Sequence, residues 1–374
     1  MTATARGEPG SQGEAQTTGG VQSVSAVIVN YNGGDRVLRT IRCLSKSSAA
    51  VEAILVIDNG SSDGSGAALK VRFPEIDVHE LERNIGLPAA RQLGLERVRS
   101  DRVVFVDADV YVDPDCVERL CRAMSDSDAA VACPQVRLLP DGTTVQTDGT
   151  SAHFVGTMLL ENASIPVREA ATSRRFVGGC IGACMLVDRA RALAAGGFDP
   201  RYFFQFEDLE FTLRLRSLGH RIVSEPSAVV YHDRGSGWPE LSWRQPGRYP
   251  TGRAFYTLRN RWLTILLHFR WRTLAVLAPA LLVHELAVLA YAIRRRWFLA
   301  WVSGWAWHFR HSMETWNRRR WIQERRQASD RDLLVGGPIP VADGVLTTPL
   351  AKFGAGTLSR TLNAYWHVSN RLIG

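Results

Sequence analysis

Two familiar nucleotide-binding signatures are missing from this chain of 374 residues. No Gly-x-Gly-x-x-Gly follows the first predicted strand, and no Gly-x-x-x-x-Gly-Lys-[Ser/Thr] occurs anywhere. Both motifs use glycine to bring backbone N–H groups close to phosphates. Their absence argues against a dinucleotide-binding domain and against a P-loop nucleotidase.

Paired cysteines are also missing. No Cys-x-x-Cys occurs among the six cysteines, and several of them fall on faces that we predict to be buried. Zinc sites and disulfide scaffolds need paired or closely spaced cysteines, so core thiols in a reducing compartment are the better interpretation. This points to the cytoplasm. The cysteines are Cys43, Cys116, Cys121, Cys133, Cys180 and Cys184.

The start of the chain lacks an apolar run. Residues 1–20 are rich in Gly, Thr, Ala and Gln, so we expect neither a signal peptide nor a stop-transfer segment, but a disordered leader over 1–22. The rest is long enough, and with 45% apolar residues hydrophobic enough, for one large packed domain with an appendage or for two domains.

Strand and helix patterns alternate through the first hundred residues. Apolar runs predict strands at 24–30, 53–57, 78–81 and 103–106, and helical spacing predicts helices at 36–45, 66–72 and 88–98. Beyond them we expect a helix at 117–124, a strand at 129–133 and an irregular Gly/Thr-rich section through 165. Such alternation is typical of an α/β fold with a doubly wound parallel sheet. The carboxyl ends of its strands, where such sheets bind ligands, are the place to look for a site.

The strand at 103–106 ends in two carboxylates, Asp107 and Asp109. Acids spaced in this way can converge on a hard divalent cation, which prefers oxygen ligands and completes its shell with water and substrate phosphates. Mg²⁺ or Mn²⁺ is therefore the expected ion. An ordinary turn is the alternative, because Asp113 and Asp115 just beyond belong to turn and helix-start chemistry.

Polar turns follow the other predicted strands at the same edge, at 30–34, 58–64 and 83–86. Tyr31 offers a ring that can stack on a base, Asp58 can accept a hydrogen bond from a base imide, and glycines allow close backbone approach to ligand oxygens. Together these loops can build a nucleotide site. The run at 59–64 also fits an ordinary loop with a helix cap.

Two adjacent acids, Glu207 and Asp208, lie among the aromatic residues of 202–211. Apolar surroundings disfavour an ionised carboxylate and make it a better proton acceptor at neutral pH, as a general base requires. The alternative is that the acids simply begin an amphipathic helix, since Leu209 and Leu213 follow at helical spacing.

Four motifs in order resemble the family 2 glycosyltransferases of GT-A fold. They are 27–32 (VIVNYN), 56–65 (VIDNGSSDGS), 84–91 (NIGLPAAR) and 107–109 (DAD). The resemblance implies that Tyr31 and Asp58 hold the base, that Arg91 lies at the diphosphate, and that Asp107 and Asp109 serve the ribose and the metal. The nucleotide-binding residues that it implies are Tyr31, Asn32, Asp58, Ser61, Asp63, Asn84, Arg91 and Asp107.

The same resemblance implies that Asp208 is the catalytic base and that Glu207 helps to position the acceptor. The family often has Asp where this chain has Glu210, which leaves the role of that acid open. Several relatives place a metal-ligating His where His232 stands, so the implied metal ligands are Asp107, Asp109 and His232. The glycine-containing run at 177–187 would line the sugar pocket, although a core strand is equally consistent with it.

The composition changes in the back half. Residues 244–326 hold sixteen Arg, three Glu, no Lys and eight of the eleven Trp. The apolar run 273–293 has the length of a membrane span, but Pro279, His284 and Glu285 favour a re-entrant or interfacial helix. We expect 253–326 to contact an anionic membrane surface. A packed helical subdomain is the alternative; a nucleic-acid interface fits the apolar run less well.

The sequence thus predicts a disordered leader (1–22), a GT-A domain (23–235), an Arg/Trp-rich helical region that associates with membrane (236–330), and a linker with a C-terminal amphipathic helix (331–374). The predicted enzyme is an inverting, metal-dependent transferase, most like bacterial rhamnosyltransferases, at the cytoplasmic face of the membrane. It would move a sugar from dTDP-rhamnose or a UDP-hexose to a polyprenyl-linked or cell-envelope glycan.

A competing interpretation is a non-catalytic membrane-surface binding protein on a degenerate transferase fold. A degenerate site would be expected to have lost at least one of Asp58, Asp107, Asp109 and Asp208, and all four are present. Sugar-1-phosphate nucleotidyltransferases share the half-sheet, but the Gly-rich first loop with a downstream Lys that marks them is absent.

Overall fold

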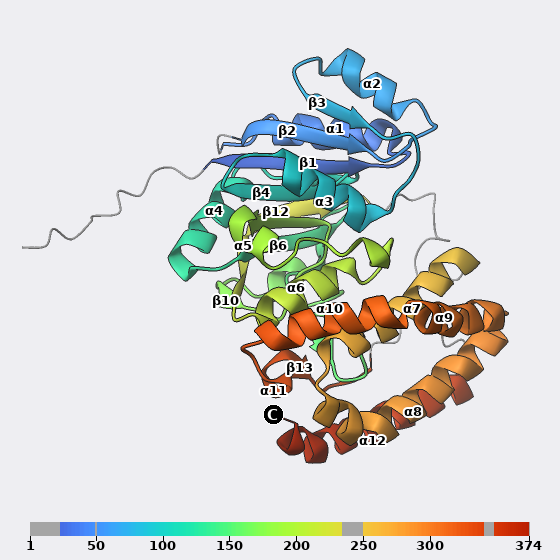
Figure 1. Cartoon of the computed structure of the whole chain (residues 1–374). Helices are drawn as coiled ribbons and strands as arrows, with labels where there is room; N and C mark the ends of the chain where they lie inside the picture. The colour runs from blue at the N-terminus through green and yellow to red at the C-terminus, as the bar shows by residue number, and fades with distance from the viewer. Residues whose placement is uncertain (1–22, 49–50, 234–249, 340–347, 374) are drawn as a thin grey trace, which may run out of the picture.

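The computed structural model describes residues 23–48, 51–233, 250–339 and 348–373. The leader expected at 1–22 lies outside the described residues, as does the boundary expected at 235. The described chain forms a large mixed sheet between two layers of helices, followed by a helical back half (Figure 1).

Four parallel strands form the first half of the sheet, as the sequence predicts. They are β1 (Val24–Asn30), β2 (Val51–Asp58), β3 (Asp77–Glu80) and β4 (Arg102–Asp107). β1 lies between β2 and β4, with Asn30 beside Asp58 and Val29 beside Asp107. The polar residues that end these strands therefore meet at one edge, because parallel strands present their carboxyl ends together.

The sheet continues beyond β4 in the order β11, β6, β12, β10. These strands are β11 (Cys184–Asp188), β6 (Val131–Leu138), β12 (Ile222–His232) and β10 (Arg175–Phe176). β11 runs antiparallel to β4, and β12 runs parallel to β6. β5 (Val110–Val112) pairs with the end of β12, with Val110 opposite His232. This pairing brings a residue from late in the chain beside Asp109.

Helices cover both faces of the sheet. One apolar layer is formed with α1 (Gly34–Leu44), α2 (Ser65–Arg72) and α4 (Cys116–Ser127). The other is formed with α3 (Leu87–Arg97), α5 (Arg189–Ala194) and α6 (Glu207–Ser217). Strands covered on both faces read as continuous apolar runs, and β1 is buried throughout.

A second, small sheet corrects one expectation. The sequence predicted an irregular section from 134 to 165, but it contains β7 (Thr144–Thr147), β8 (Thr150–His153) and β9 (Met158–Leu160). β7 extends the main sheet, while β8 pairs with β9 on one side and with β13 (Leu334–Val335) on the other. Strands of three or four residues show too little alternation to be seen in sequence, and β13 pairs with β8 only through the tertiary fold.

The back half is helical, as predicted. Its helices are α7 (Thr251–His268), α8 (Trp271–Arg294), α9 (Phe298–Arg310), α10 (Ser312–Arg325), α11 (Asp330–Leu333) and α12 (Pro349–Ser369). Short 3-10 turns occur at Val167–Glu169, Pro200–Tyr202 and Asn370–Leu372. In Figure 1 α10 lies below the sheet domain, while α8 and α12 form the far edge of the molecule.

α8 is long and apolar enough to cross a membrane by length and composition. The two polar residues at its centre face the protein, however. Glu285 accepts hydrogen bonds from Arg261 Nη1 at 2.6 Å and from the indole N–H groups of Trp262 and Trp301, and His284 is also buried. The outward face is left apolar.

Candidate active site

Arg91 lies at the centre of the candidate site. It projects from α3, is 2% exposed, and pairs with Asp107 at 2.7 Å and with Glu207 at 3.4 Å. Its Nη2 also donates to the Gly182 carbonyl at 2.8 Å. The glycine at 182 allows this close approach, because a Cβ there would meet the guanidinium and Arg91 would have to shift. One buried cation thus joins the end of β4 to the start of α6.

Asp208 and Glu207 lie in the first turn of α6. Asp208 Oδ2 accepts a hydrogen bond from the Gly182 N–H at 3.0 Å, and its Oδ1 accepts from the Leu209 N–H at 2.8 Å. Burial raises the pKa of Asp208 despite these donors and Arg91. Burial and the neighbouring Asp208 charge also raise the pKa of Glu207, to about 8. Burial with nearby like charge is the arrangement that tunes a carboxylate toward proton transfer near neutral pH.

Asp109 and His232 face each other across the β5–β12 pairing, with Oδ1 3.5 Å from Nε2. His232 Nδ1 donates to Gln146 Oε1 at 2.8 Å, so in the neutral imidazole Nε2 carries the free lone pair and points toward Asp109. Burial would raise the pKa of Asp109, but two effects outweigh it and lower that pKa: the hydrogen bond and charge that His232 supplies when both ring nitrogens are protonated, and the charge of Arg36.

The three expected metal ligands do not converge. Asp107 turns to Arg91, and within the described ranges no group of three His, Cys, Asp or Glu side chains could hold an ion. Asp109 and His232 still fit a divalent cation that draws its remaining ligands from diphosphate and water. The Gln146 contact is the kind of supporting hydrogen bond that orients a metal-binding imidazole.

The loops after β1 and β2 are tied together by buried polar side chains. Asn30 is fully buried; its Nδ2 lies within hydrogen-bond distance of Asp58 Oδ1, Ser61 Oγ and Ser65 Oγ, and its Oδ1 accepts from the Gly33 N–H. Ser61 also donates to Asp58 Oδ1. One oxygen of Asp58 is therefore already engaged by two donors from the protein.

The remaining predicted nucleotide residues also connect loops. Asn32 Oδ1 accepts from the Ser62 N–H at 2.8 Å, and Asp63 accepts from the Gly34 N–H at 3.0 Å. Asn84 accepts from Asn59 Nδ2 at 3.1 Å. Tyr31, in contrast, is 52% exposed at this edge and free to stack. The structure brings the predicted residues to one edge, and direct contact with a nucleotide stays a prediction.

Glu210, whose role the sequence left open, is a buried structural acid. It pairs with Arg214 one turn later at 2.8 Å, both side chains are 0% exposed, and His268 of α7 contacts it at 3.2 Å. Burial opposes its charge, but Arg214 and His268 lower its pKa well below the ordinary range. It therefore ties α6 to α7.

Sequence reasoning overlooked three functional contacts. Asn30 was seen only as part of a motif, although a buried Asn at a strand end signals a loop organiser. Gly182 is one of several glycines in the run 177–187, and nothing in the sequence indicates which of them contacts Arg91. Gln146 lies in the section that the sequence predicts to be irregular, so no sequence pattern connects it with His232.

Comparison with known proteins adds a sequence relationship and a fold relationship. Residues 25–191 match the family described as Glycosyl transferase family 2. The chain is 28% identical over 282 residues to N-acetylglucosaminyl-diphospho-decaprenol L-rhamnosyltransferase of Mycobacterium tuberculosis, covering 63% of this chain and 90% of the relative. The crystal structure of GalNAc-T7 with UDP, GalNAc and Mn²⁺ is similar in fold, with a TM-score of 0.54 at 18% identity, over 70% of this chain and 51% of that one.

Proposed function

Residues 25–191 make this chain a family 2 glycosyltransferase, and on that premise we propose that it transfers a sugar from a nucleoside diphosphate to a lipid-linked or cell-envelope glycan. The proposed donor is dTDP-rhamnose or a UDP-hexose. The mycobacterial relative supports this choice, because its name specifies rhamnosyl transfer to N-acetylglucosamine on a decaprenyl diphosphate. The enzyme would be rhamnosyltransferase-like and act in cell-envelope biosynthesis.

The observation that carries the proposal is the buried clamp at Arg91 and Gly182, which joins Asp107 to Glu207 and Asp208. In the proposed mechanism Asp208 accepts the proton of an acceptor hydroxyl, and that oxygen attacks the anomeric carbon from the face opposite the nucleotide. The configuration inverts without a covalent enzyme intermediate. Asp208 has a raised pKa, which makes it a stronger proton acceptor than an ordinary aspartate.

Asp109 and His232 would hold Mg²⁺ or Mn²⁺, with the remaining ligands drawn from diphosphate and water, while Asp107 pairs with Arg91. When bound, such an ion neutralises negative charge on the departing diphosphate. Gln146 keeps the imidazole of His232 in the tautomer that leaves Nε2 free. Tyr31 would stack on the base, while Asp58 and the loops joined by Asn30 would surround the nucleoside.

A transfer assay tests the proposal. The full chain would be incubated with dTDP-rhamnose, UDP-glucose or UDP-galactose and a short-chain polyprenyl-diphospho-N-acetylglucosamine, with Mg²⁺, Mn²⁺ or EDTA. We expect transfer from one donor and its loss in EDTA. Tight nucleotide binding with no transfer from any donor would support the competing function, a non-catalytic membrane-surface protein.

We further propose that the back half docks on the cytoplasmic membrane surface. The outward face of α8 presents Leu282, Leu286 and Ile293, which are 61%, 56% and 57% exposed, at helical spacing. α9 and α10 expose Phe309 and Met313 at 86% and 69%. Large apolar side chains exposed in rows on neighbouring helices are typical of a membrane or protein interface.

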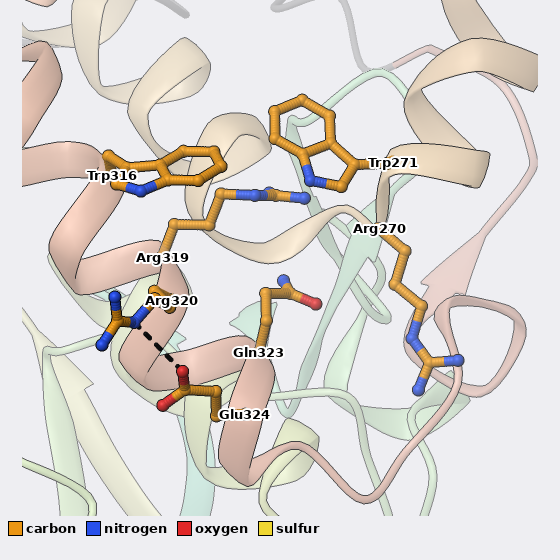
Figure 2. A pocket seen from close by; sticks show the side chains of 7 residues that line it. All are labelled: Arg270, Trp271, Trp316, Arg319, Arg320, Gln323 and Glu324. Atoms are coloured by element: carbon orange, nitrogen blue, oxygen red, sulfur yellow. Dashed lines mark ion pairs between the residues drawn. The ribbon is translucent and has the colours of Figure 1, made fainter.

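A basic pocket of about 400 Å³ lies where α8 begins beside α10 (Figure 2). The guanidinium of Arg319 stacks on Trp271, 4.1 Å from the ring centre, and Arg320 pairs with Glu324 at 3.1 Å. Trp271 and Trp316 stay about half exposed, at 58% and 49%. Arginine with tryptophan suits the headgroup level of an anionic leaflet, which supports docking through 253–326. The pocket is lined by Arg270, Trp271, Trp316, Arg319, Arg320, Gln323 and Glu324.

A further inference from the structure

The loop before the catalytic acids holds an unusual backbone conformation. Phe203, Gln205 and Phe206 have φ of 57°, 70° and 69°, the left-handed region that residues with a Cβ rarely adopt. Phe206 directly precedes Glu207 at the start of α6. Such strain persists only where surrounding contacts hold the backbone in place. Those contacts come from α7 in the helical back half and from α3.

Asn260 of α7 supplies the main contacts. It is 0% exposed, and its Nδ2 lies within hydrogen-bond distance of three loop carbonyls: Tyr202 at 2.9 Å, Phe204 at 2.9 Å and Gln205 at 2.7 Å. A peptide carbonyl accepts and cannot donate, so only a donor can satisfy this cluster. The amide group of Asn260 therefore has a defined orientation.

Arg259 fixes that orientation from the other side. Its Nε and Nη2 donate to Asn260 Oδ1 at 2.8 and 2.6 Å, which leaves only Nδ2 for the loop. Nη2 also donates to the carbonyls of Arg201 at 2.6 Å and Tyr202 at 3.1 Å. The pair is itself held by α9, where His308 Nε2 lies 3.0 Å from the Arg259 carbonyl.

The opposite side of the loop rests on α3, the helix that carries Arg91. The Leu87 N–H donates to the Phe203 carbonyl at 2.8 Å, and Gly86 leaves no room for a Cβ beside Phe203. The Phe203 ring stacks on Tyr256 of α7 at 5.0 Å. The loop is thus clamped between α3 and α7, and its end sets where α6 begins.

We propose that Arg259 and Asn260 are positioning residues for catalysis: they hold the 203–206 loop so that Asp208 and Glu207 face Gly182 and Arg91. The back half then completes the active site in addition to contacting the membrane. The inference rests on the proposed function for the role of Asp208. The contacts between α7 and the loop do not depend on that role.

The test compares N260D with N260A. Aspartate has the same shape as asparagine and would keep, or strengthen, the contact with Arg259. It would, however, place a carboxylate oxygen, which cannot donate, against the three loop carbonyls. If only packing or the Arg259 contact mattered, N260D would behave like the wild type. We expect kcat to fall by about 10²-fold in both variants, since displacement by about 1 Å can cost this much, with donor KM within about twofold. Tyr365→Phe, which removes a hydrogen bond to the Val276 carbonyl elsewhere in the back half, should keep wild-type kcat.

A rescue separates positioning from general damage. Gln205→Gly in the N260A background should recover about tenfold or more of the lost kcat, because glycine adopts φ of 70° without a Cβ penalty. If circular dichroism shows that N260D or N260A is unfolded, Arg259→Lys is used in place of both. Lysine cannot make the forked contacts of Arg259. It is then tested as a single variant and in combination with Gln205→Gly. Wild-type kcat in N260D, or in Arg259→Lys where it is the substitute, overturns the inference, as does a rescue that restores stability without kcat. Full activity of Asp208→Asn would instead contradict the proposed function.

Discussion

Gln146 of β7 and His232 of β12, two strands that each pair with β6, form a partly buried hydrogen bond, with Gln146 Oε1 2.8 Å from His232 Nδ1. The bond selects the imidazole tautomer and directs Nε2 toward Asp109. On the proposed metal role of His232, Gln146 thereby holds the imidazole in the tautomer that can act as a ligand.

Gln146→Leu should therefore weaken Mn²⁺ binding in the presence of UDP or dTDP by about 10 to 100-fold, because loss of such supporting bonds typically has this effect. Calorimetric or electron-paramagnetic titration of Mn²⁺ measures it. Gln135→Leu is the matched control: Gln135 is as buried, at 3% against 2%, but contacts Arg137 instead. Equal Mn²⁺ affinity in the wild type and Gln146→Leu would show that His232 is not a ligand.

Asp208→Asn should lower kcat by about 10² to 10⁴-fold while nucleotide affinity changes little, since a general base acts only on the acceptor proton. Single-turnover transfer and nucleotide titration separate the two effects. Asp188→Asn serves as control. Asp188 accepts a hydrogen bond from the Arg191 N–H as the cap of α5, and it lies at the end of β11 that is farther along the chain from Gly182, the residue that contacts Asp208. Retained turnover in Asp208→Asn would remove it as the base.

Glu207 should make stability depend on pH in a defined direction. Its pKa is about 8 in the folded protein, above the ordinary 4.5, so between these values the native state holds a proton that the unfolded chain has released. The free energy of unfolding should fall as pH rises through this window, by up to about 1.4 kcal/mol per pH unit. Glu207→Gln should remove that fall.

Urea denaturation from pH 5 to pH 9 measures this effect as the difference between Glu207→Gln and the wild type. The exposed Glu52 offers a control, since Glu52→Gln should follow the wild-type curve. Parallel curves for the wild type and Glu207→Gln would mean that Glu207 is ionised throughout.

The Glu210–Arg214 pair should be a stability element. Arg214→Met leaves a buried carboxylate without its main partner, at a cost of about 3 to 5 kcal/mol in the free energy of unfolding. Arg122→Met removes an exposed pair with Glu118 at the same helical spacing and should cost less than about 1 kcal/mol. Similar losses in both variants would contradict the assigned burial.

Membrane docking should depend on the outward face of α8. The full chain should co-sediment with anionic liposomes and be partly released by high salt, which screens the arginine contribution. Leu282→Asp with Leu286→Asp should weaken binding by about tenfold or more, because each exposed leucine would lose its insertion. Val71→Asp, 81% exposed on α2, is the control. Unchanged sedimentation of the double variant would place the membrane contact elsewhere.

The sequence by itself determined the parallel half-sheet, the edge at which its polar loops gather, and the helical back half. These follow from short-range patterns. Strands buried on both faces require continuous apolar runs, as in β1 and β4, and each loop motif directly follows its strand. The adjacent Glu207 and Asp208 were likewise visible because their aromatic neighbours are adjacent in sequence.

Only the tertiary structure decided which side chains meet. The bond from Asn260 to the 203–206 loop, the Gln146 contact with His232, and the turn of Asp107 toward Arg91 each join residues that are distant in the chain or on separate strands. No local period encodes such pairs, because a buried donor selects the acceptor that the packed chain places within about 3 Å. The same packing turns Glu285 inward and leaves the outward face of α8 apolar.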